Sequence, residues 1–260
     1  VPAAQPKLPK VKRRARTMKK GPALKSERFV RRQVEQLAEA KWNEAFKLLK
    51  KLIRSTPDSD RAKPDLYFRL SEMYWERASS TEVRAFANEE KCLERFPGAQ
   101  GERTCAAPRK QMVAKSDQMR DKAIRVYLHI VRNFPDYPKL DGVLFALAFN
   151  YQRKNQPTKA EKIYKTIIQK YPRSRHAADT LLNLAEIFFE AGRVRDASRV
   201  YGTVVRNFKR SGVYGYALYK LGWCEYNLGE YKKALTRFVS VLQYSRSLKG
   251  KGSRNRMTLE

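Results

Sequence analysis

The residues able to do chemistry are few, and they do not form a catalytic set. The chain has two histidines, His129 and His176, and three cysteines, Cys92, Cys105 and Cys224. Two histidines are too few for a three-histidine zinc site, and no Gly-x-Ser-x-Gly, GxxxxGK[ST] or GxGxxG motif occurs. We therefore predict a protein that is not an enzyme and that uses no metal, cofactor or small-molecule substrate.

One pair of acids could still be proposed as catalytic. Glu72 and Glu76 lie four residues apart, so both carboxylates would share one face of a helix. That spacing is common on solvated helices and does not by itself indicate acid–base catalysis.

The cysteines divide into a pair and a single residue. Cys92 and Cys105 lie 13 positions apart on either side of a turn-forming segment at residues 97–101. A disulfide between them is geometrically plausible, and closing such a loop contributes about 3 kcal/mol in the chain-entropy model. The alternative is two reduced thiols in a cytosolic protein. Cys224, beside Trp223, is interpreted as a small core residue.

The positive charge is concentrated at the two ends of the chain. Of a net charge of +30, half belongs to residues 1–32 and 245–260. This composition predicts basic flexible tails at 1–25 and 248–260, the latter alternatively opening a further repeat. Such tails either stay solvated or contact a polyanion such as nucleic acid or anionic lipid. The candidate polyanion contacts are Lys12, Arg13, Arg14, Arg16, Lys19 and Lys20.

The rest of the chain has the composition of a folded protein. Apolar residues make up 42% of the sequence and aromatic residues 11%, which is enough to fill a core. The longest apolar runs span only a few residues, whereas a membrane-spanning helix needs about 20. We expect a soluble chain without a transmembrane segment.

Three segments repeat with an offset of 37 residues. Each has two helical stretches of period 3.6 separated by a short turn, which predicts a helical hairpin. Small residues at fixed places would let the two helices approach closely. The matching positions are Leu147-Ala148, Tyr151, Ala160 and Tyr164; Leu184-Ala185, Phe188, Ala197 and Tyr201; and Leu221-Gly222, Ala234 and Phe238.

This pattern resembles the tetratricopeptide repeat, lengthened from its usual period of about 34 residues. The resemblance implies an all-α, right-handed α-solenoid of about five helical hairpins over residues 26–247. The first hairpin would carry Trp42 and Ala45 on its second helix. The predicted repeats start near Ser26, Pro64, Asp141, Ala178 and Gly215.

The second repeat contains an insertion at residues 78–119, which predicts that both of its helices extend into a protruding hairpin. An apolar stripe is expected on the outgoing helix, formed by Val83, Phe86, Cys92, Leu93 and Phe96. The tip is expected at residues 97–101, with Pro108 at the start of the returning helix.

The last predicted hairpin lacks a capping helix. Leu235, Val239 and Leu242 would then be partly uncovered. We therefore expect either a longer repeat protein, of which this chain is a fragment, or a partner that covers this end.

In this family the concave groove is lined by fixed positions of the first helices, and here these positions are rich in aromatic residues. Exposed rings suit a peptide or helix ligand, whereas the alternative is that they only pack against neighbouring helices. Lys and Asn that clamp a terminal carboxylate in chaperone-binding members are absent. The predicted groove residues are Phe68, Glu72, Trp75, Phe145, Phe149, Glu186, Phe189, Tyr216, Tyr219, Trp223 and Tyr226.

A narrower resemblance is to bacterial envelope proteins with this repeat, of the types of the β-barrel assembly lipoprotein D and the periplasmic cell-division coordinator. It is carried by Asn133-Phe134-Pro135, Lys170-Tyr171-Pro172-Arg173-Ser174 and His176-Ala177-Ala178. The resemblance implies a protein-binding scaffold in the periplasm or on the periplasmic face of a membrane, with envelope-complex components as partners. The alternative is a cytoplasmic protein that binds a polyanion through its basic tails.

Overall fold

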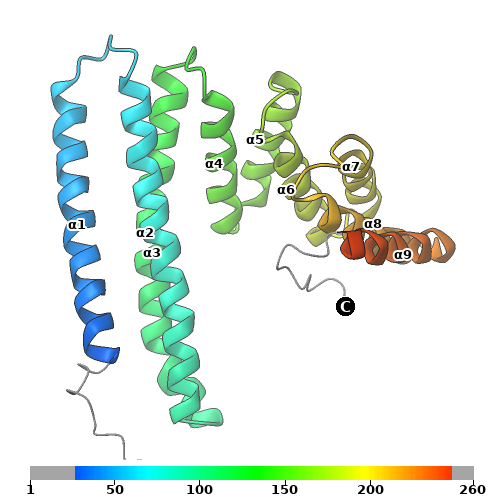
Figure 1. Ribbon diagram of the computed structural model, residues 1–260, viewed down its shortest axis with the longest axis horizontal. Coiled ribbons are helices and arrows are strands. Elements are labelled where there is room, and N and C mark those ends of the chain that lie inside the picture. Colours follow the sequence, from blue (N-terminus) through cyan, green and yellow to red (C-terminus); the bar gives the residue numbers. More distant parts are fainter. Residues whose placement is uncertain (1–26, 248–260) are drawn as a thin grey trace, which may run out of the picture. The chain divides into compact units, whose positions relative to one another are not determined.

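The computed structural model describes residues 27–247 of the chain. Residues 1–26 and 248–260 lie outside this part. Both predicted tails lie there, and so do the candidate polyanion contacts between Lys12 and Lys20. All regular secondary structure within residues 27–247 is α-helical, with nine helices and no strand (Figure 1). The predicted all-α class is confirmed.

The chain divides into two compact units, residues 1–48 and residues 49–260, and each is considered by itself. In the second unit each helix from α2 to α9 packs against the next one in the chain, as in a helical solenoid. The helices are α1 (Glu27–Ser55), α2 (Lys63–Arg95), α3 (Ala99–Asn133), α4 (Leu140–Arg153), α5 (Pro157–Lys170), α6 (Ala177–Glu190), α7 (Val194–Asn207), α8 (Tyr214–Asn227) and α9 (Tyr231–Ser247).

Helix α1 takes the place of the first predicted hairpin. Where the sequence predicts two helices from Ser26 onward, the structure has one continuous helix over Glu27–Ser55. The reason is that residues 27–55 contain neither Gly nor Pro, so nothing in this segment favours a turn. The described helices therefore form four hairpins preceded by one long helix.

Helices α2 and α3 form the predicted extended hairpin, whose outer part at residues 78–119 we call the arm. They contain 33 and 35 residues, whereas each helix from α4 to α8 contains 14. The two long helices lie side by side along their length (Figure 1). The insertion thus lengthens both helices of one repeat and leaves the later repeats unchanged.

The tip of the arm depends on two glycines. Gly98 has a φ of 85°, a left-handed conformation that glycine adopts at least cost. A Cβ on Gly101 would lie 1.5 Å from the carbonyl oxygen of Phe96, so no larger residue fits there without a backbone shift. Because the reversal is complete at Gly98, Pro108 lies inside α3 and not at its start, contrary to the prediction.

The apolar stripe predicted on the arm does not all face the returning helix. Val83, Phe86 and Phe96 are exposed, whereas Ala78 and Ala85 are buried. These two alanines lie seven residues apart, the spacing of a seam between two closely packed helices. Small residues therefore occupy the seam, and the large apolar side chains point away from it.

Helices α4 to α9 form three hairpins with matching turns. One residue in each turn has a left-handed backbone, namely Asn155, Gly192 and Gly229, with φ of 54°, 72° and 78°. These residues are 37 positions apart, in the register predicted from the sequence. Glycine and asparagine tolerate this conformation best, so each turn is specified locally.

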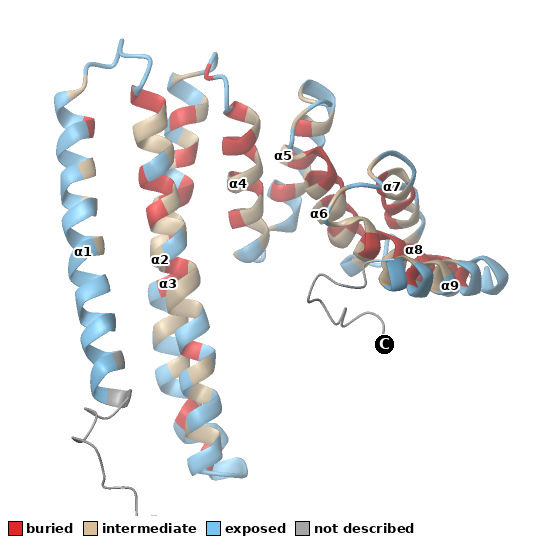
Figure 2. Cartoon of the chain, in the orientation of Figure 1, coloured by how far each residue is buried: buried red, intermediate tan, exposed pale blue. Residues whose placement is uncertain are grey.

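The core of the second unit follows the repeat pattern (Figure 2). Ala148 and Ala185 are fully buried on the first helices, while Tyr164 and Tyr201 fill the space on the second helices. The third hairpin has Gly222 at the matching position, where a Cβ would lie 2.8 Å from the ring of Phe238. The small residues thus set how closely the two helices of each hairpin approach.

Asp65 connects the start of α2 to the loop between α3 and α4. Its Oδ1 accepts hydrogen bonds from the hydroxyl of Tyr137 at 2.7 Å and from Nζ of Lys139 at 2.6 Å. The hydrogen bond from Lys139, followed by that from Tyr137, lowers the pKa of Asp65 from its ordinary value of 3.8.

This lowered pKa predicts a pH-dependent contribution to stability. Ionised Asp65 stabilises the fold fully above pH 3.8, and the contribution is lost as the pH falls through the lower folded-state pKa. In the wild type, the free energy of unfolding should fall as the pH is lowered, and Asp65→Asn is expected to make this fall smaller. Urea titrations at several pH values measure the change. The matched control is Asp136→Asn, in the loop between α3 and α4. An equal effect of both variants would contradict the role assigned to Asp65.

Two kinds of feature are absent from residues 27–247. No helix there is long and apolar enough to cross a bilayer. No group of three or more His, Cys, Asp or Glu side chains there could hold a metal ion.

Candidate partner-binding surface

The predicted groove residues all lie on first helices of the hairpins, α2, α4, α6 and α8. Nine of the eleven are half-buried, while Trp223 and Tyr226 are exposed. The structure thus places these residues on equivalent helices, and it leaves the largest ring surface accessible on α8.

Several of the rings pack against neighbouring helices, as the alternative interpretation expected. The ring of Phe145 stacks on His176 with centroids 5.1 Å apart, and it also contacts Tyr164 at 6.1 Å. Phe68 contacts Tyr127 at 6.2 Å. These rings serve partly as packing groups, which limits the surface they can offer to a ligand.

The rings on α8 are arranged differently. Trp223 contacts Tyr219 at 6.2 Å and Tyr226 at 5.7 Å, in both cases edge to face. Trp223 also contacts Phe238 of α9 at 5.7 Å. Because each ring is held by another, Trp223 and Tyr226 present a pre-organised aromatic surface at little further entropic cost.

Glu186 is engaged within the chain rather than available as a free carboxylate. It accepts a hydrogen bond from the hydroxyl of Tyr201, and its Oε2 lies 3.3 Å from Nζ of Lys220 and 3.4 Å from the hydroxyl of Tyr216. Burial, followed by the charge of Glu186, raises the pKa of Tyr216 to about 12. Neutral phenols and one lysine therefore satisfy this carboxylate, and Nζ of Lys220 also lies 4.0 Å from the ring of Phe189.

The acids on α2 are paired in a looser way. Nη1 of Arg69 lies 3.4 Å from Oε2 of Glu72 and 3.2 Å from Oε1 of Glu76, and all three side chains are partly exposed. Exposed pairs of this kind exchange readily with solvent and contribute little to stability. Glu72 and Glu76 can therefore turn to a cationic ligand more easily than Glu186 can.

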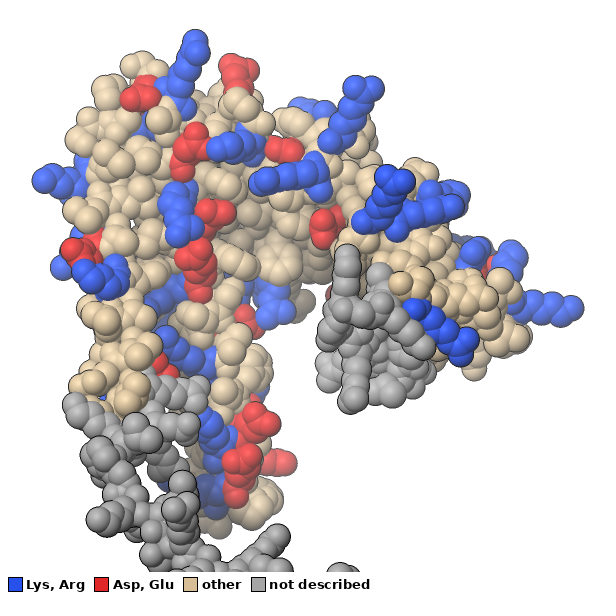
Figure 3. Space-filling view, viewed as in Figure 1, with Lys and Arg blue, Asp and Glu red and all other residues tan. Residues whose placement is uncertain are grey.

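Charge is segregated between the two helices of the last three hairpins. Helices α4, α6 and α8 together contain five acidic and two basic residues, whereas α5, α7 and α9 contain two acidic and eleven basic residues. Figure 3 shows Lys and Arg side chains projecting along this part of the molecule. The first-helix face is thus the more acidic of the two.

Cavities lined by described residues of the second unit include three that lie away from the predicted groove. The largest of these three, about 550 Å³, is lined by residues that include Asp58, Asp65 and Tyr137. The others have volumes of about 360 Å³, between α5, α6 and α7, and about 290 Å³, between α2 and α3. None of the predicted groove residues lines these three cavities.

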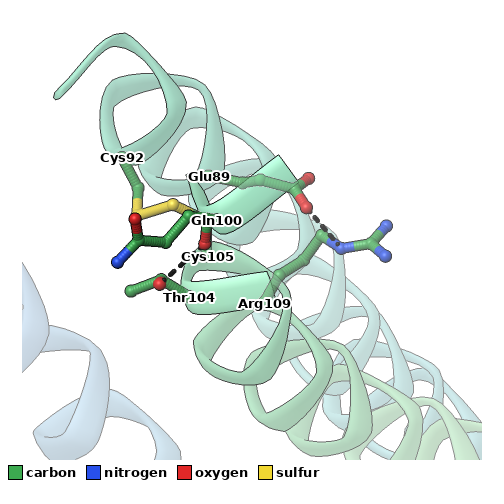
Figure 4. The surroundings of a disulfide bond; sticks show 6 residues. All are labelled: Glu89, Cys92, Gln100, Thr104, Cys105 and Arg109. Carbon is green, nitrogen blue, oxygen red and sulfur yellow. Dashed lines mark hydrogen bonds and ion pairs between the residues drawn. A yellow bond between two sulfur atoms is a disulfide. The ribbon is translucent and has the colours of Figure 1, made fainter. Parts of the chain in front are cut away.

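The structure joins Cys92 and Cys105 by a disulfide that crosses the arm next to its tip, with the two Cα atoms 5.8 Å apart (Figure 4). Close by, Nε of Arg109 lies 2.9 Å from Oε1 of Glu89. Cys224 is a buried free thiol, and burial raises its pKa to about 12. The paired cysteines therefore tie α2 to α3, and Cys224 is a poor nucleophile.

A charged network at the base of the arm was not predicted from the sequence. Glu82 of α2 lies between Arg120 of α3 and Arg153 of α4, with an N–O distance of 2.5 Å to each. Only 2% of the Arg120 side chain is exposed. No spacing rule relates these positions, because they belong to three different helices.

Comparison with known proteins supports the repeat assignment. Two models of the tetratricopeptide repeat family match residues 143–174 and 182–243. No curated protein matches the sequence.

One solved structure shows the same fold at low sequence identity. The apo form of RapI superimposes with a TM-score of 0.55 and 14% identity, over 84% of this chain and 52% of RapI. This chain therefore spans about half the length of RapI. BtubC from P. vanneervenii has a TM-score of 0.49 and 14% identity, over 84% of this chain and 93% of BtubC. A putative kinesin light chain from Podosopora anserina has a TM-score of 0.48 and 12% identity, over 84% of this chain and 93% of that protein.

The family matches fall on the three hairpins whose 37-residue register, matching turns and buried small residues were described above. The RapI likeness extends the same fold over most of the chain. The protein is thus an α-solenoid that contains tetratricopeptide repeats within residues 143–174 and 182–243.

Proposed function

We propose that this protein is a non-catalytic scaffold that binds a protein partner on the first-helix face of its repeats. The observation that carries the proposal is the exposed, mutually supported aromatic surface of Trp223 and Tyr226 on α8. Large rings held in place are the side chains that contribute most to protein interfaces. The favoured ligand is an extended peptide or a helix with apolar and basic side chains, since the first-helix face carries the acids.

We further propose that the partner belongs to a bacterial cell-envelope complex. Two observations support this location, namely the Tyr171-Pro172-Arg173-Ser174 junction of the sequence and the cysteine pair at the tip of the arm. Disulfides persist in oxidising compartments such as the periplasm and are rare in the cytosol. Alkylation of the native protein in its source cells, followed by peptide mass spectrometry, tests the location: free thiols at Cys92 and Cys105 would contradict it.

The groove assignment predicts where a partner will cross-link. A photo-reactive amino acid at Tyr226 or Phe189 should capture the partner in source cells, because both positions lie on the first-helix face. The same group at Lys162 or Arg199, exposed on second helices, is the matched control. Cross-links of equal yield at all four positions would reject the assignment.

Truncating the rings should weaken the interaction with the partner identified in this way. The triple variant Trp75→Ala, Phe149→Ala and Trp223→Ala is expected to lower affinity at least about tenfold, the effect of losing a binding hot spot. The control is Phe86→Ala, which removes an exposed ring from the arm. Unchanged affinity with an intact helical circular-dichroism spectrum would contradict the proposal.

A further inference from the structure

The last described helix carries an exposed apolar stripe. Tyr231, Leu235, Val239 and Leu242 recur at spacings of four, four and three residues, so they lie on one side of α9. Their exposed fractions are 63%, 66%, 44% and 39%. A solvated surface helix would normally place polar residues on such a side.

Aromatic rings of α8 continue this stripe. The ring of Tyr226 lies 5.3 Å from that of Tyr231, and Trp223 lies 5.7 Å from Tyr226. Trp223 and Tyr226 are themselves exposed. We call the continuous surface formed by these six residues the end face: Trp223, Tyr226, Tyr231, Leu235, Val239 and Leu242.

The end face lies in a strongly basic part of the chain. Residues 193–247 contain eleven Lys and Arg and three Asp and Glu. On α9, Lys232 follows Tyr231 directly and Arg246 comes four positions after Leu242, and both are exposed. Within the described part of the chain neither forms an ion pair with an acidic side chain.

A further hairpin of the usual kind fits this surface poorly. The positions that match Leu235 and Val239 on α5 are Glu161 and Lys165, and both contact the following hairpin. Oε2 of Glu161 pairs with Nη1 of Arg193 at 3.2 Å, and Nζ of Lys165 lies 5.7 Å from the ring of Phe188.

On α7 the same two positions hold Ser198 and Gly202. Where a hairpin follows, these two positions are thus polar or small, whereas on α9 they are large and apolar. The position of Leu242 is apolar in all three hairpins, with Ile168 on α5 and Val205 on α7. At the positions of Leu235 and Val239, the end face therefore differs from the surfaces that this chain uses to stack its own repeats.

We propose that the end face docks α9 onto an anionic phospholipid surface. Leu235, Val239 and Leu242 would enter the interfacial region of the bilayer, and Trp223 and Tyr226 would lie at the level of the head groups. Lys232 and Arg246 would contact lipid phosphates, with the other basic residues of α7 and α9 adding long-range attraction. Trp223 and Tyr226 belong both to the end face and to the surface proposed to bind the protein partner. The other residues proposed to bind that partner, on α2, α4 and α6, lie outside the end face.

Co-sedimentation with lipid vesicles tests the proposal. The full chain should pellet with vesicles of phosphatidylglycerol and phosphatidylcholine in equal amounts, and should remain in solution with phosphatidylcholine alone. Leu235→Glu with Val239→Glu should reduce the bound fraction at least about tenfold, because the apolar side chains no longer enter the interface. Lys232→Gln with Arg246→Gln should reduce it by at least about tenfold through lost attraction to phosphates.

A matched control separates the end face from exposed apolar residues in general. Val83→Glu with Phe86→Glu makes the same kind of change on the arm, at side chains that are 68% and 49% exposed. This control should bind vesicles as the wild type does. Equal losses in both double variants would overturn the proposal.

A second measurement can be made first on the wild-type chain. Vesicles with brominated phosphatidylglycerol should quench tryptophan fluorescence of the wild-type chain, and Trp223→Phe should remove the quenched part. Docking on anionic lipid would be rejected if the vesicles caused no quenching or if the chain bound neutral vesicles. It would also be rejected if the chain bound duplex DNA and Leu235→Glu with Val239→Glu left this binding unchanged. A third contrary result would be a chain that binds no vesicles but forms a dimer in solution, if this double variant dissociates the dimer.

Two variants distinguish a failure of lipid docking from a failure of the proposed binding to a protein partner. Trp75→Ala with Phe149→Ala should retain vesicle binding, since neither residue lies on the end face. Leu235→Glu with Val239→Glu should conversely retain the cross-link from Phe189 to the protein partner.

Discussion

Arg120→Ala is expected to lower the free energy of unfolding by about 3–5 kcal/mol, the effect of removing one partner from a buried ion pair. Arg120 is almost fully buried, and its Nη2 lies 2.5 Å from Oε2 of Glu82. Its loss leaves a cavity and removes one of the two cations that neutralise Glu82. Since Glu82 also binds Arg153 of α4, the arm would lose part of its fixation to the repeats. Urea unfolding followed by circular dichroism measures the change.

Two further variants separate charge from packing in this network. Arg120→Met keeps most of the side-chain volume and leaves Glu82 paired with Arg153, so its cost should be clearly smaller. Arg125→Ala, at an exposed position of the same helix, should change stability by less than about 0.5 kcal/mol. A cost of Arg120→Ala as small as that of Arg125→Ala would show that the network does not fix the arm.

Removing the disulfide should destabilise the outer arm by about 3 kcal/mol, the chain-entropy estimate for a loop of this size. In Cys92→Ser with Cys105→Ser, the tip loses the disulfide cross-link between α2 and α3. We expect the effect to be local, because the tip of the arm projects beyond α4 (Figure 1). Amide hydrogen exchange should therefore become faster around the tip and stay unchanged in α6 to α8.

Chemical reduction provides the control for this prediction. Dithiothreitol should speed exchange at the tip of the wild-type chain and should have no effect on the double variant. Cys224 remains as an internal reference, since its buried thiol with a raised pKa should react with iodoacetamide only when α8 unfolds. Identical exchange at the tip in wild type and variant would mean that helix packing alone holds the arm.

Much of the repeat architecture could be predicted from local sequence signals. The turns at Asn155, Gly192 and Gly229 need a residue that tolerates a left-handed backbone, and these residue types recur every 37 positions. Gly222 and its matching alanines are likewise visible as small residues in an apolar pattern. These features can be predicted from the sequence because each depends on one residue and its nearest neighbours in the chain.

The prediction of a first hairpin was wrong for a related reason. An apolar period of 3.6 fits one long helix as well as two short ones, and only a turn signal distinguishes them. Residues 27–55 offer none, so the structure continues as α1. The stripe on the arm shows the same limit, because periodicity marked Val83 and Phe86 as apolar but did not show which side of α2 meets α3.

The sequence by itself thus determined the all-α class, the 37-residue register and the positions of the later turns, because these follow from backbone preferences and residue size. Tertiary structure decided the rest. Only the packing of α6 against α7 and α8 shows that Tyr201, Tyr216 and Lys220 satisfy Glu186, and only the meeting of three helices creates the Arg120–Glu82–Arg153 network. The physical reason is that charge neutralisation and exposure depend on which atoms meet in space, and residues distant in the chain leave no mark of that meeting in local sequence.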